Sequence, residues 1–348
     1  MQPSSKCQPC LPVLSLCLGL AACGTNETST PAWQIVHHDL EGALLSVWGT
    51  SASDVWTVGS DSRDGQGPLV LHFDGTSWER VNTGQTGDLW WVFGFETGEL
   101  FFGGEGGTIL RKDGDGFVRM PTPDTGTVFG IWGDSPADVW AVGGQTGGAS
   151  GAFAWRLHGD EWTAAAGFPA DLPRTDALWK VFGQGPDDVW MVGTGGKTLH
   201  SDGATLSEAF TGHPESLFTV HSDGARFAAV GGFASGLILE RDVGASPDSP
   251  WIDVSPKDAL ALSGVCLSHQ GGYAVGQFGY IAARTAEGWH TEATGLDRDF
   301  GTRGLHSVWI DPEGGVWAVG GQVLDEPLVD GILLHRGKPV PARRAPLP

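Results

Sequence analysis

Short apolar runs rich in Val, Trp and Phe alternate along this chain with links rich in Gly, Ser, Pro and Asp. The clearest runs come in pairs and form a phrase that recurs as SVWGTSASDVWTVG (46–59), GIWGDSPADVWAVG (130–143), KVFGQGPDDVWMVG (180–193) and SVWIDPEGGVWAVG (307–320). Runs of β-branched and aromatic residues that are bounded by turn residues are typical of β-strands. Each phrase therefore predicts two short strands joined by a tight link.

Three more divergent copies fill the gaps between these phrases, at 91–104, 219–231 and 264–276. The seven copies start at residues 46, 91, 130, 180, 219, 264 and 307, so successive copies are 39 to 50 residues apart. This is the period of a four-stranded propeller blade and not that of a helical repeat. We therefore predict an all-β fold, a seven-bladed β-propeller over residues 33–337.

Two further strands complete each predicted blade. The third strand ends in Asp-Gly at 74–75, 113–114 and 202–203, a hairpin signal that requires a positive φ. The fourth strand carries a Trp in four blades: Trp78, Trp162, Trp251 and Trp289. The regular spacing of this Trp after the turn indicates a packing role.

The seventh copy lacks a fourth strand, because the chain continues after Gly337 into the sequence KPVPARRAPLP. The sequence WQIV at 33–36 resembles WERV at 78–81. We predict that this N-terminal strand completes the last blade. Such an exchange closes the ring and leaves no open sheet edge between the first and last blades.

Twelve of the 16 Trp residues fall at three repeat positions. Neighbouring blades cover both faces of each sheet, so we expect these Trp side chains to form the core, with stacking on sugars as the alternative. The link inside the phrase carries Asp54, Asp138 and Asp188 in three copies. We expect this Asp to bond the backbone of its own turn, which is a structural role.

Residues 1–22 contain one charged residue, Lys6, and the apolar stretch LPVLSLCLGL, which is too short to span a bilayer and has the shape of a secretion signal. It ends in Leu-Ala-Ala-Cys, which resembles the lipobox of bacterial lipoproteins. The resemblance implies cleavage before Cys23 and lipid attachment to Cys23, and several acyl chains would make a stable membrane anchor. An ordinary cleaved signal is the alternative.

This interpretation divides the chain into a signal peptide at 1–22, a lipidated tether at 23–32, the propeller at 33–337 and a disordered tail at 338–348. Gly24 stands where an Asp would, by analogy with enteric bacteria, signal retention in the inner membrane. We therefore expect a protein of the bacterial cell envelope that is lipid-anchored in the outer membrane.

Composition narrows the range of partners. The formal net charge is −21, and such an acidic surface repels phosphate backbones, which argues against nucleic acid as a partner.

Cys266 is the only Cys beyond position 23, so the ring has no internal disulfide. Cys266 aligns with Trp48 on a first strand, which predicts a buried and unreactive thiol. We expect a monomer.

No nucleotide-binding loop, zinc-type Cys and His cluster or hydrolase motif occurs, so we expect no cofactor and no metal. The segment 113–116, Asp-Gly-Asp-Gly, lacks the later bidentate Glu of a calcium loop, and a hairpin turn explains it as well. Four His near third-strand ends lie in blades too far apart for a shared metal site: His72, His158, His200 and His335. These patterns contain no direct evidence for an enzyme.

The Val-Trp-Gly, Asp-Val-Trp-Ala-Val-Gly and Asp-Gly-x-x-Trp phrases resemble the Gly/Trp-rich propeller repeats of secreted bacterial proteins. More distantly they resemble sialidase-type Asp-box propellers and photosystem II assembly factor propellers. The resemblance covers residues 33–337 and implies architecture rather than activity. A sialidase would need a Tyr nucleophile, but Tyr273 and Tyr280 fall on predicted strands and the Asp-box pattern is not met. This ranks a glycosidase below a binding module.

The links from second to third strand and from each blade to the next vary in length, whereas most other links are short. In an up-and-down blade the variable links emerge on one face, and insertions gathered on one face often mark the binding face. Charged residues on these links form the candidate binding face: Arg63, Asp64, Arg174, Asp176, Arg298, Asp299, Arg303, Asp325 and Glu326.

We expect a non-catalytic, membrane-anchored module that binds a protein or an envelope glycan on this face. One alternative is that the loops are tolerated variation on a scaffold. The other is an extracellular glycan-active hydrolase or lyase, which would need facing carboxylates about 5–10 Å apart at the ring mouth.

Overall fold

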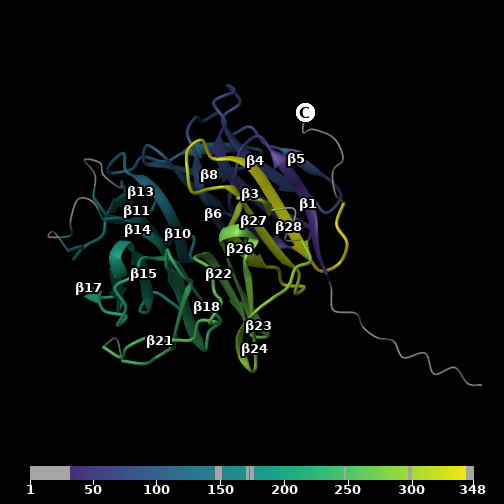
Figure 1. The fold of residues 1–348 in the computed structure, drawn as a ribbon. Coiled ribbons are helices and arrows are strands. Elements are labelled where there is room, and N and C mark those ends of the chain that lie inside the picture. The colour runs from purple at the N-terminus through teal and green to yellow at the C-terminus, as the bar shows by residue number, and fades with distance from the viewer. Residues whose placement is uncertain are drawn as a thin grey trace, which may run out of the picture. The chain divides into compact units, whose positions relative to one another are not determined.

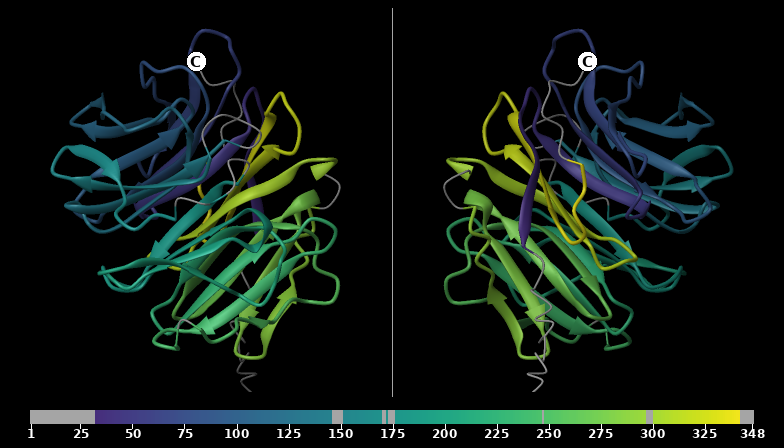
Figure 2. Two further views of the ribbon diagram at one scale, coloured as in Figure 1. Left: turned by 90° about the vertical axis from the view of Figure 1, so that its left-hand side faces the viewer. Right: turned by 90° about the vertical axis from the view of Figure 1, so that its right-hand side faces the viewer.

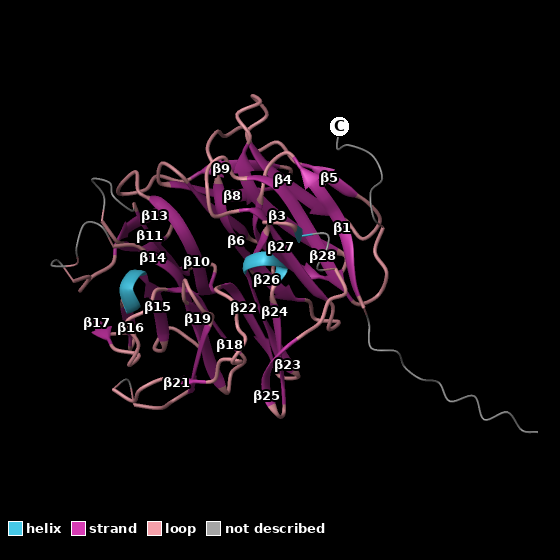
Figure 3. Cartoon of the chain, viewed as in Figure 1, coloured by secondary structure: helices cyan, strands magenta, loops and turns pink. Residues whose placement is uncertain are grey.

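The computed structural model describes residues 32–145, 151–169, 172, 176–246, 248–296 and 300–341. This part of the chain is almost entirely β-structure and includes two short 3-10 helices, η1 (Thr194–Gly196) and η2 (Gln277–Gly279) (Figure 3). The strands form seven four-stranded sheets (Figures 1 and 2). The predicted seven-bladed propeller is confirmed.

Each of the first six blades uses four consecutive strands, and the first strand of each lies nearest the axis, where it contacts the first strands of its neighbours. Blade 1 contains β2 (Leu44–Ser51), β3 (Asp54–Asp61), β4 (Pro68–Phe73) and β5 (Trp78–Arg80); blade 2 contains β6 (Leu89–Gly94), β7 (Leu100–Gly104), β8 (Thr108–Asp113) and β9 (Gly116–Arg119); blade 3 contains β10 (Thr127–Ser135), β11 (Asp138–Gly144), β12 (Phe153–His158) and β13 (Glu161–Ala164). Blade 4 contains β14 (Leu178–Gly183), β15 (Val189–Gly193), β16 (Thr198–Ser201) and β17 (Leu206–Ala209); blade 5 contains β18 (Leu217–Ser222), β19 (Arg226–Gly231), β20 (Leu237–Asp242) and β21 (Ile252–Asp253); blade 6 contains β22 (Leu262–Ser268), β23 (Gly271–Gly276), β24 (Ile281–Thr285) and β25 (Gly288–Thr291).

The seventh blade joins the two ends of the propeller. It contains β26 (Gly304–Ile310), β27 (Val316–Gln322), β28 (Val329–Arg336) and, as its outer strand, β1 (Trp33–Leu40). β1 pairs antiparallel with β28 and places Trp33 opposite Arg336 (Figure 1). The N-terminal strand therefore closes the ring, as predicted.

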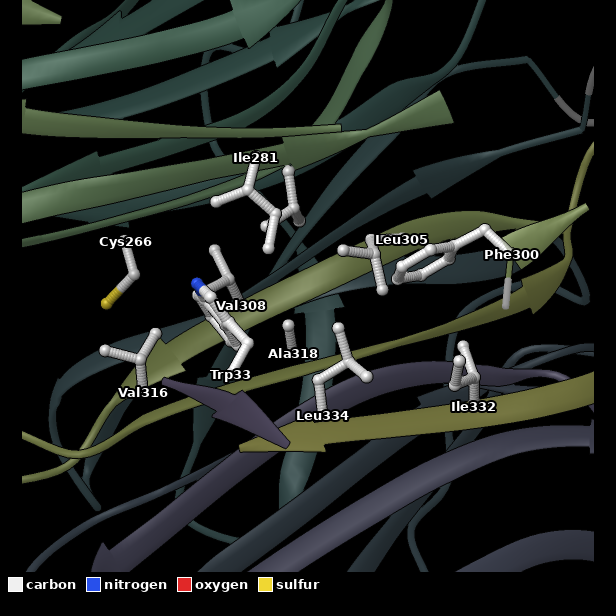
Figure 4. Close-up of a cluster of buried hydrophobic side chains, with 11 residues drawn as sticks. Trp33, Cys266, Ile281, Phe300, Leu305, Val308, Val316, Ala318, Ile332 and Leu334 are labelled. Carbon is white, nitrogen blue, oxygen red and sulfur yellow. The ribbon is translucent and has the colours of Figure 1, made fainter. Parts of the chain in front are cut away.

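Trp33 packs at the interface between the sixth and seventh blades. Its indole N–H donates to Glu292 Oε1 at 2.7 Å, and its ring meets Tyr273 edge-on at 5.9 Å between centroids. Figure 4 shows Trp33 among buried side chains that come from both blades, including Cys266 and Leu334. Burial raises the pKa of the Cys266 thiol to about 12, which confirms a buried thiol that stays protonated.

The Trp-Gly pair of the phrase interlocks successive blades. Trp132 of blade 3 packs against Gly183 of blade 4, where a Cβ would lie 2.5 Å from Trp132 Cη2. In the same way, a Cβ at Gly94 would lie 2.7 Å from Trp48 Cζ3 of the preceding blade. Real Cβ contacts do not come this close, so Gly is required where the preceding blade supplies a Trp.

Ten of the twelve repeat Trp are buried, which confirms the core assignment for them. The other two, Trp48 and Trp309 of blades 1 and 7, are only half-buried. Both are first-strand residues near the axis, and both line a surface cavity there. The prediction of a core role was incomplete for these two residues.

The Asp of the phrase bonds side chains rather than its own turn backbone. Asp54 lies 2.7 Å from His72 Nε2 and accepts hydrogen bonds from the indole N–H of Trp56 at 3.2 Å and from Thr50 Oγ1 at 2.5 Å. His72 sits directly opposite Trp56 on the third strand, and the two rings stack at 4.0 Å. The role is structural, but the predicted partners were wrong, because the Asp joins the second and third strands.

Two other blades repeat this arrangement with small changes. Asp188 accepts from the Trp190 indole at 2.8 Å and lies 3.0 Å from His200 Nε2. Asp138 instead accepts two hydrogen bonds from Arg156, at 2.9 and 2.8 Å. The third-strand partner of this Asp can thus be His or Arg, because either side chain can donate a hydrogen bond to the carboxylate.

The Trp-Gly interlock predicts that Gly183→Ala destabilises the ring by about 1–3 kcal/mol, because the added methyl group overpacks the Trp132 site. Trp132→Leu should recover part of this loss in the double variant, since it removes the ring atom 2.5 Å away. Chemical denaturation followed by circular dichroism measures both effects. Gly116→Ala is the control, because its Cβ would meet no atom closer than 3.6 Å. Equal stability of the Gly183 and Gly116 variants would contradict the interlock.

Candidate functional site

The links between strands divide the propeller into two unlike faces. First-to-second links are short, as at 52–53 in blade 1, whereas the links at 165–177 and 292–303 between blades are long. Pairing within the blades is antiparallel, so the long links share one face with the second-to-third links. We refer to this as the variable-loop face and to the other as the short-loop face, whose longest link is 243–251 in blade 5.

Every first strand contains a β-bulge at its second or third residue, where the register against the second strand shifts. The seven bulge residues, which we name the bulge ring, are Leu45, Trp90, Phe129, Trp179, Phe218, Ser263 and His306. A bulge redirects a side chain that the regular pleat would place elsewhere. Because each first strand follows a link between blades, the bulge ring lies at the axis on the variable-loop face.

The aromatic members of the bulge ring contact one another around the axis. Ring centroids are 5.1 Å apart for Trp90 and Phe129, 4.6 Å for Phe129 and Trp179, and 5.9 Å for Trp179 and Phe218. Trp90 also meets His306 at 5.8 Å, although these residues come from blades 2 and 7, which are not neighbours. The bulges therefore gather an aromatic cluster at the channel mouth.

Exposed hydrophobic side chains gather on the same face. Seven large hydrophobic residues are exposed among the described residues, and five belong to links of the variable-loop face: Phe210, Phe233, Leu260, Phe278 and Leu324. Phe233 is 70% exposed, and its ring lies 5.5 Å from that of Phe218 in the bulge ring. Apolar side chains gathered on one face mark an interaction surface more often than isolated ones do.

The predicted charged residues do not form one cluster. Arg63 is held by acidic side chains of blades 1 and 2, at 3.3 Å from Asp61, 3.4 Å from Glu105 and 3.8 Å from Asp88. Its side chain is still 61% exposed. Asp64 pairs separately with Arg80 at 3.6 Å.

The remaining predicted residues lie at other points of the rim. Arg303 donates to Asp39 Oδ1 at 3.0 Å beside the ring-closing strand. Asp325 and Glu326 are exposed on the link between β27 and β28, and Asp176 is half-buried before β14. The other three, Arg174, Arg298 and Asp299, fall outside the described residues. An interaction role for these charges stays a prediction.

A buried carboxylate lies beneath Arg63. Asp88 accepts a hydrogen bond from the backbone N–H of Asp61 at 2.8 Å and is 3% exposed. Burial raises the pKa of Asp88 to about 6, and the Glu105 and Glu326 carboxylates add to the rise, while the Asp61 hydrogen bond and Arg63 oppose it. The proton on Asp88 is therefore gained and lost near neutral pH.

The channel beneath the bulge ring is filled by side chains. The Lys180 ammonium donates to Phe129 O at 2.8 Å and Trp179 O at 3.1 Å, and it lies 4.4 Å from the centre of the Trp91 ring. Burial lowers the pKa of Lys180 to about 7. A cavity of only about 100 Å³ is left there, next to His221 and other first-strand residues. Lys180 and Trp91 thus separate the two mouths of the ring.

The short-loop face carries a larger hollow at the axis, with a volume of about 580 Å³. Blades 6, 7, 1 and 2 contribute its walls, through Trp48, Phe95, Trp309 and the acidic residues Glu96 and Glu313. The binding face predicted from the sequence lies on the other side of the ring, so that prediction does not include this hollow. The sequence carries no signal that Trp48 and Trp309 are half-buried, because both occupy the same repeat position as the buried Trp132.

The structure also places the residues considered for metal binding. His72, His200 and His335 occupy one equivalent position, and the ring of each contacts the ring of the second-strand Trp opposite. The segment 113–116 forms the hairpin turn between β8 and β9. Within the described ranges no group of three His, Cys, Asp or Glu is arranged to hold a metal ion, and no helix is long and apolar enough to span a membrane.

No family model and no curated protein sequence matches this chain. Solved propellers do match in structure. YCF48 bound to D1 peptide is 15% identical with a TM-score of 0.64, over 89% of this chain and 100% of that one. YCF48 from Cyanidioschyzon merolae is 15% identical with a TM-score of 0.65, over 88% and 98%.

A third match is the extracellular domain of the putative hybrid two-component system BT3049 from B. thetaiotaomicron. It is 12% identical with a TM-score of 0.60, over 88% of this chain and 41% of that chain. At these identities the likeness is one of fold. The resemblance to photosystem II assembly factor propellers is thus confirmed for the architecture.

The bulge ring could have been found in the sequence. Two residues stand directly before each phrase: first a Leu or Val, then the bulge residue. The bulge residue is aromatic in four copies: Leu89-Trp90, Val128-Phe129, Leu178-Trp179 and Leu217-Phe218. This pair lies just before the first residue of the phrase, so the repeat of the phrase does not include it. What the sequence cannot show is the bulge, which turns these side chains together.

The environment of Asp88 predicts a pH-dependent stability. The pKa of Asp88 in the folded protein, about 6, lies above the ordinary 3.8. The binding of a proton to Asp88 therefore adds fully to the free energy of unfolding below pH 4, and this stabilisation is lost as the pH rises through 6. Asp88→Asn keeps the acceptor oxygen but removes the charge. The variant should match the natural protein at pH 4 and exceed it by about 2–3 kcal/mol at pH 7.5. Urea unfolding at both pH values measures this, and a constant difference would contradict it.

Proposed function

We propose that this protein is a non-catalytic binding module, held at the bacterial cell envelope by lipid on Cys23, that presents its variable-loop face to a protein partner. The observation that carries the proposal is the gathering of five exposed hydrophobic residues on this one face. None of these five side chains belongs to a buried hydrophobic cluster. Their burial against a partner would release water from apolar surface, which is favourable.

The bulge ring supplies a fixed centre for such an interface. Trp90 and Trp179 are half-buried, and rigid first strands hold both of them at the mouth. Hot spots of interfaces are enriched in Trp and lie near the centre of the contact, surrounded by residues that exclude water. Phe233, Phe278 and Leu324 stand on links around this centre and suit that surrounding role.

The comparison with YCF48 is consistent with a protein partner. That propeller has been solved with a peptide of D1, so a ring of this architecture can hold a polypeptide segment. The acidic side chains around Arg63 add a polar rim on blades 1 and 2. A polar rim around an apolar centre is the usual organisation of a protein interface.

Replacing Phe210, Phe233 and Leu324 together by Ser should reduce capture of partner proteins by at least about tenfold, because hot-spot contacts are lost. The melting temperature should change by no more than about 2 °C, since exposed side chains contribute little to folding. Pull-down from envelope extracts with quantitative mass spectrometry measures capture.

The matched control is Val118→Ser with Ile252→Ser, which removes exposed apolar side chains from the outer strands β9 and β21. A second arm replaces Arg174, Arg298 and Arg303 by Ser and should also weaken capture, because Arg is enriched where interfaces gain energy. If the face variant captures the same proteins as the control variant, the binding face is not the variable-loop face.

The anchor is tested separately. Cys23 lies outside the described residues, and its role rests on the sequence Leu-Ala-Ala-Cys. Metabolic labelling with a clickable fatty acid should mark the natural protein and leave Cys23→Ala unmarked. Label that persists in the variant would show that Cys23 is not the attachment site.

A further inference from the structure

The hollow on the short-loop face opens where the repeat departs from its own pattern. Five blades place Trp or Phe at the first-strand position next to the axis: Trp48, Phe93, Trp132, Phe182 and Trp309. Blade 6 has Cys266 there, and blade 5 has His221. The smaller Cys266 side chain leaves space beside Trp48 and Trp309, with which it lines the internal cavity. The hollow lies at the open end of the same part of the channel, between blades 6, 7, 1 and 2.

The walls of the hollow combine aromatic and polar groups. Trp48, Trp309 and Phe95 are half-buried, so part of each ring faces solvent. Glu96 and Gln270 are exposed, and neither side chain has a hydrogen-bond partner among the described residues. The volume of about 580 Å³ falls in the range of about 300–1,000 Å³ that is usual for ligand pockets.

The indole N–H groups of Trp48 and Trp309 donate no hydrogen bond to any described residue. Neither is among the fully buried side-chain N–H groups without partners, so each keeps some exposure to solvent. In contrast, the second-strand indoles of Trp56, Trp190 and Trp317 donate to Asp side chains. The hollow therefore offers free donors as well as free acceptors.

We propose that this hollow is a binding site for an uncharged carbohydrate, with a sugar ring packed against Trp48 and Trp309. Sugar hydroxyl groups can accept from the indole N–H groups and donate to Glu96 and Gln270 at the same time, because each hydroxyl is both donor and acceptor. The apolar face of a pyranose would cover the exposed part of the indole rings, an arrangement that suits the mixed character of Trp. This site is separate from the proposed protein-binding face.

The lining disfavours both anionic ligands and ammonium ligands. It contains the carboxylates of Glu96, Asp311 and Glu313 and no Lys or Arg, so an anionic sugar or a phosphate would be repelled. An ammonium ligand would suit the carboxylates and the aromatic rings. It offers no acceptor to the two indole N–H groups, which would lose water without a replacement.

Hydrogen bonds from neighbouring segments hold one wall of the hollow. Asp311 accepts from the Trp317 indole at 2.9 Å and from the backbone N–H of Gly315 at 2.7 Å. Glu313 Oε2 accepts from the backbone N–H of Ala52 at 2.9 Å, which ties the blade 7 wall to blade 1. The site is thus formed in advance, which lowers the entropy that a ligand must lose on binding.

Isothermal titration calorimetry of the full mature chain tests the site with neutral oligosaccharides of glucose, galactose, mannose and N-acetylglucosamine. At least one should bind, and Glu96→Ala with Gln270→Ala should weaken it by at least about tenfold, since two hydrogen bonds are lost. The matched control is Glu79→Ala with Gln66→Ala, which changes the same side-chain types at exposed positions outside the hollow. The control variant should bind like the natural protein.

Trp309→Leu should also weaken binding, and intrinsic fluorescence should lose the change that the sugar causes in the natural protein. Circular dichroism checks that each variant is folded. The proposal is overturned if no neutral sugar binds, if the Glu96 and Gln270 variant binds like its control, or if choline binds in place of sugars. Release of new reducing ends during incubation would show a hydrolase and overturn simple binding. The variable-loop variant with Phe210, Phe233 and Leu324 replaced should retain sugar binding, which separates this test from that of the proposed function.

Discussion

Packing between neighbouring blades at the axis holds the whole ring together. No blade can bury both faces of its own sheet, so each depends on the next one, as in other repeat architectures. At three junctions a first-strand Trp of one blade packs against the Gly of the following blade, as for Trp132 and Gly183. A ring held in this way must also close, because an unpaired first or last blade would expose an apolar face and a sheet edge. β1 meets this need by pairing with β28 and burying Trp33.

The same packing makes the two mouths of the ring independent surfaces. Lys180 and Trp91 fill the channel between them, with the Lys180 ammonium held by two carbonyl oxygens rather than by a carboxylate. On the variable-loop side the β-bulges gather aromatic side chains, and the surrounding links expose further hydrophobic ones. On the short-loop side the walls contain indole donors and carboxylate acceptors around an open hollow. One apolar and one mixed surface suit different classes of ligand.

The candidate site was harder to predict than the fold because it depends on the directions of side chains. Loop lengths were sufficient to indicate the variable-loop face, and that division of links holds in the described structure. They could not show that Arg63 would be held by Asp61 and Glu105, because these acidic residues come together only when blades 1 and 2 pack. Nor could they show that Trp48 and Trp309 would differ from the buried Trp132, since all three occupy the same place in the repeat.

The sequence by itself determined the number of blades, the four strands of each and the closing role of residues 33–36. These follow from local patterns, since the paired strands and the turn residues between them recur at the period of a blade and need no long-range information. Only the tertiary structure decided that Asp54 would clasp Trp56 and His72 rather than its own turn. It also decided that bulge residues of different blades would meet at one mouth and that the small Cys266 would leave room beside the other. The physical reason is that local patterns specify strands and turns, whereas these contacts depend on β-bulges, strand register and packing between blades, which set the directions of the side chains.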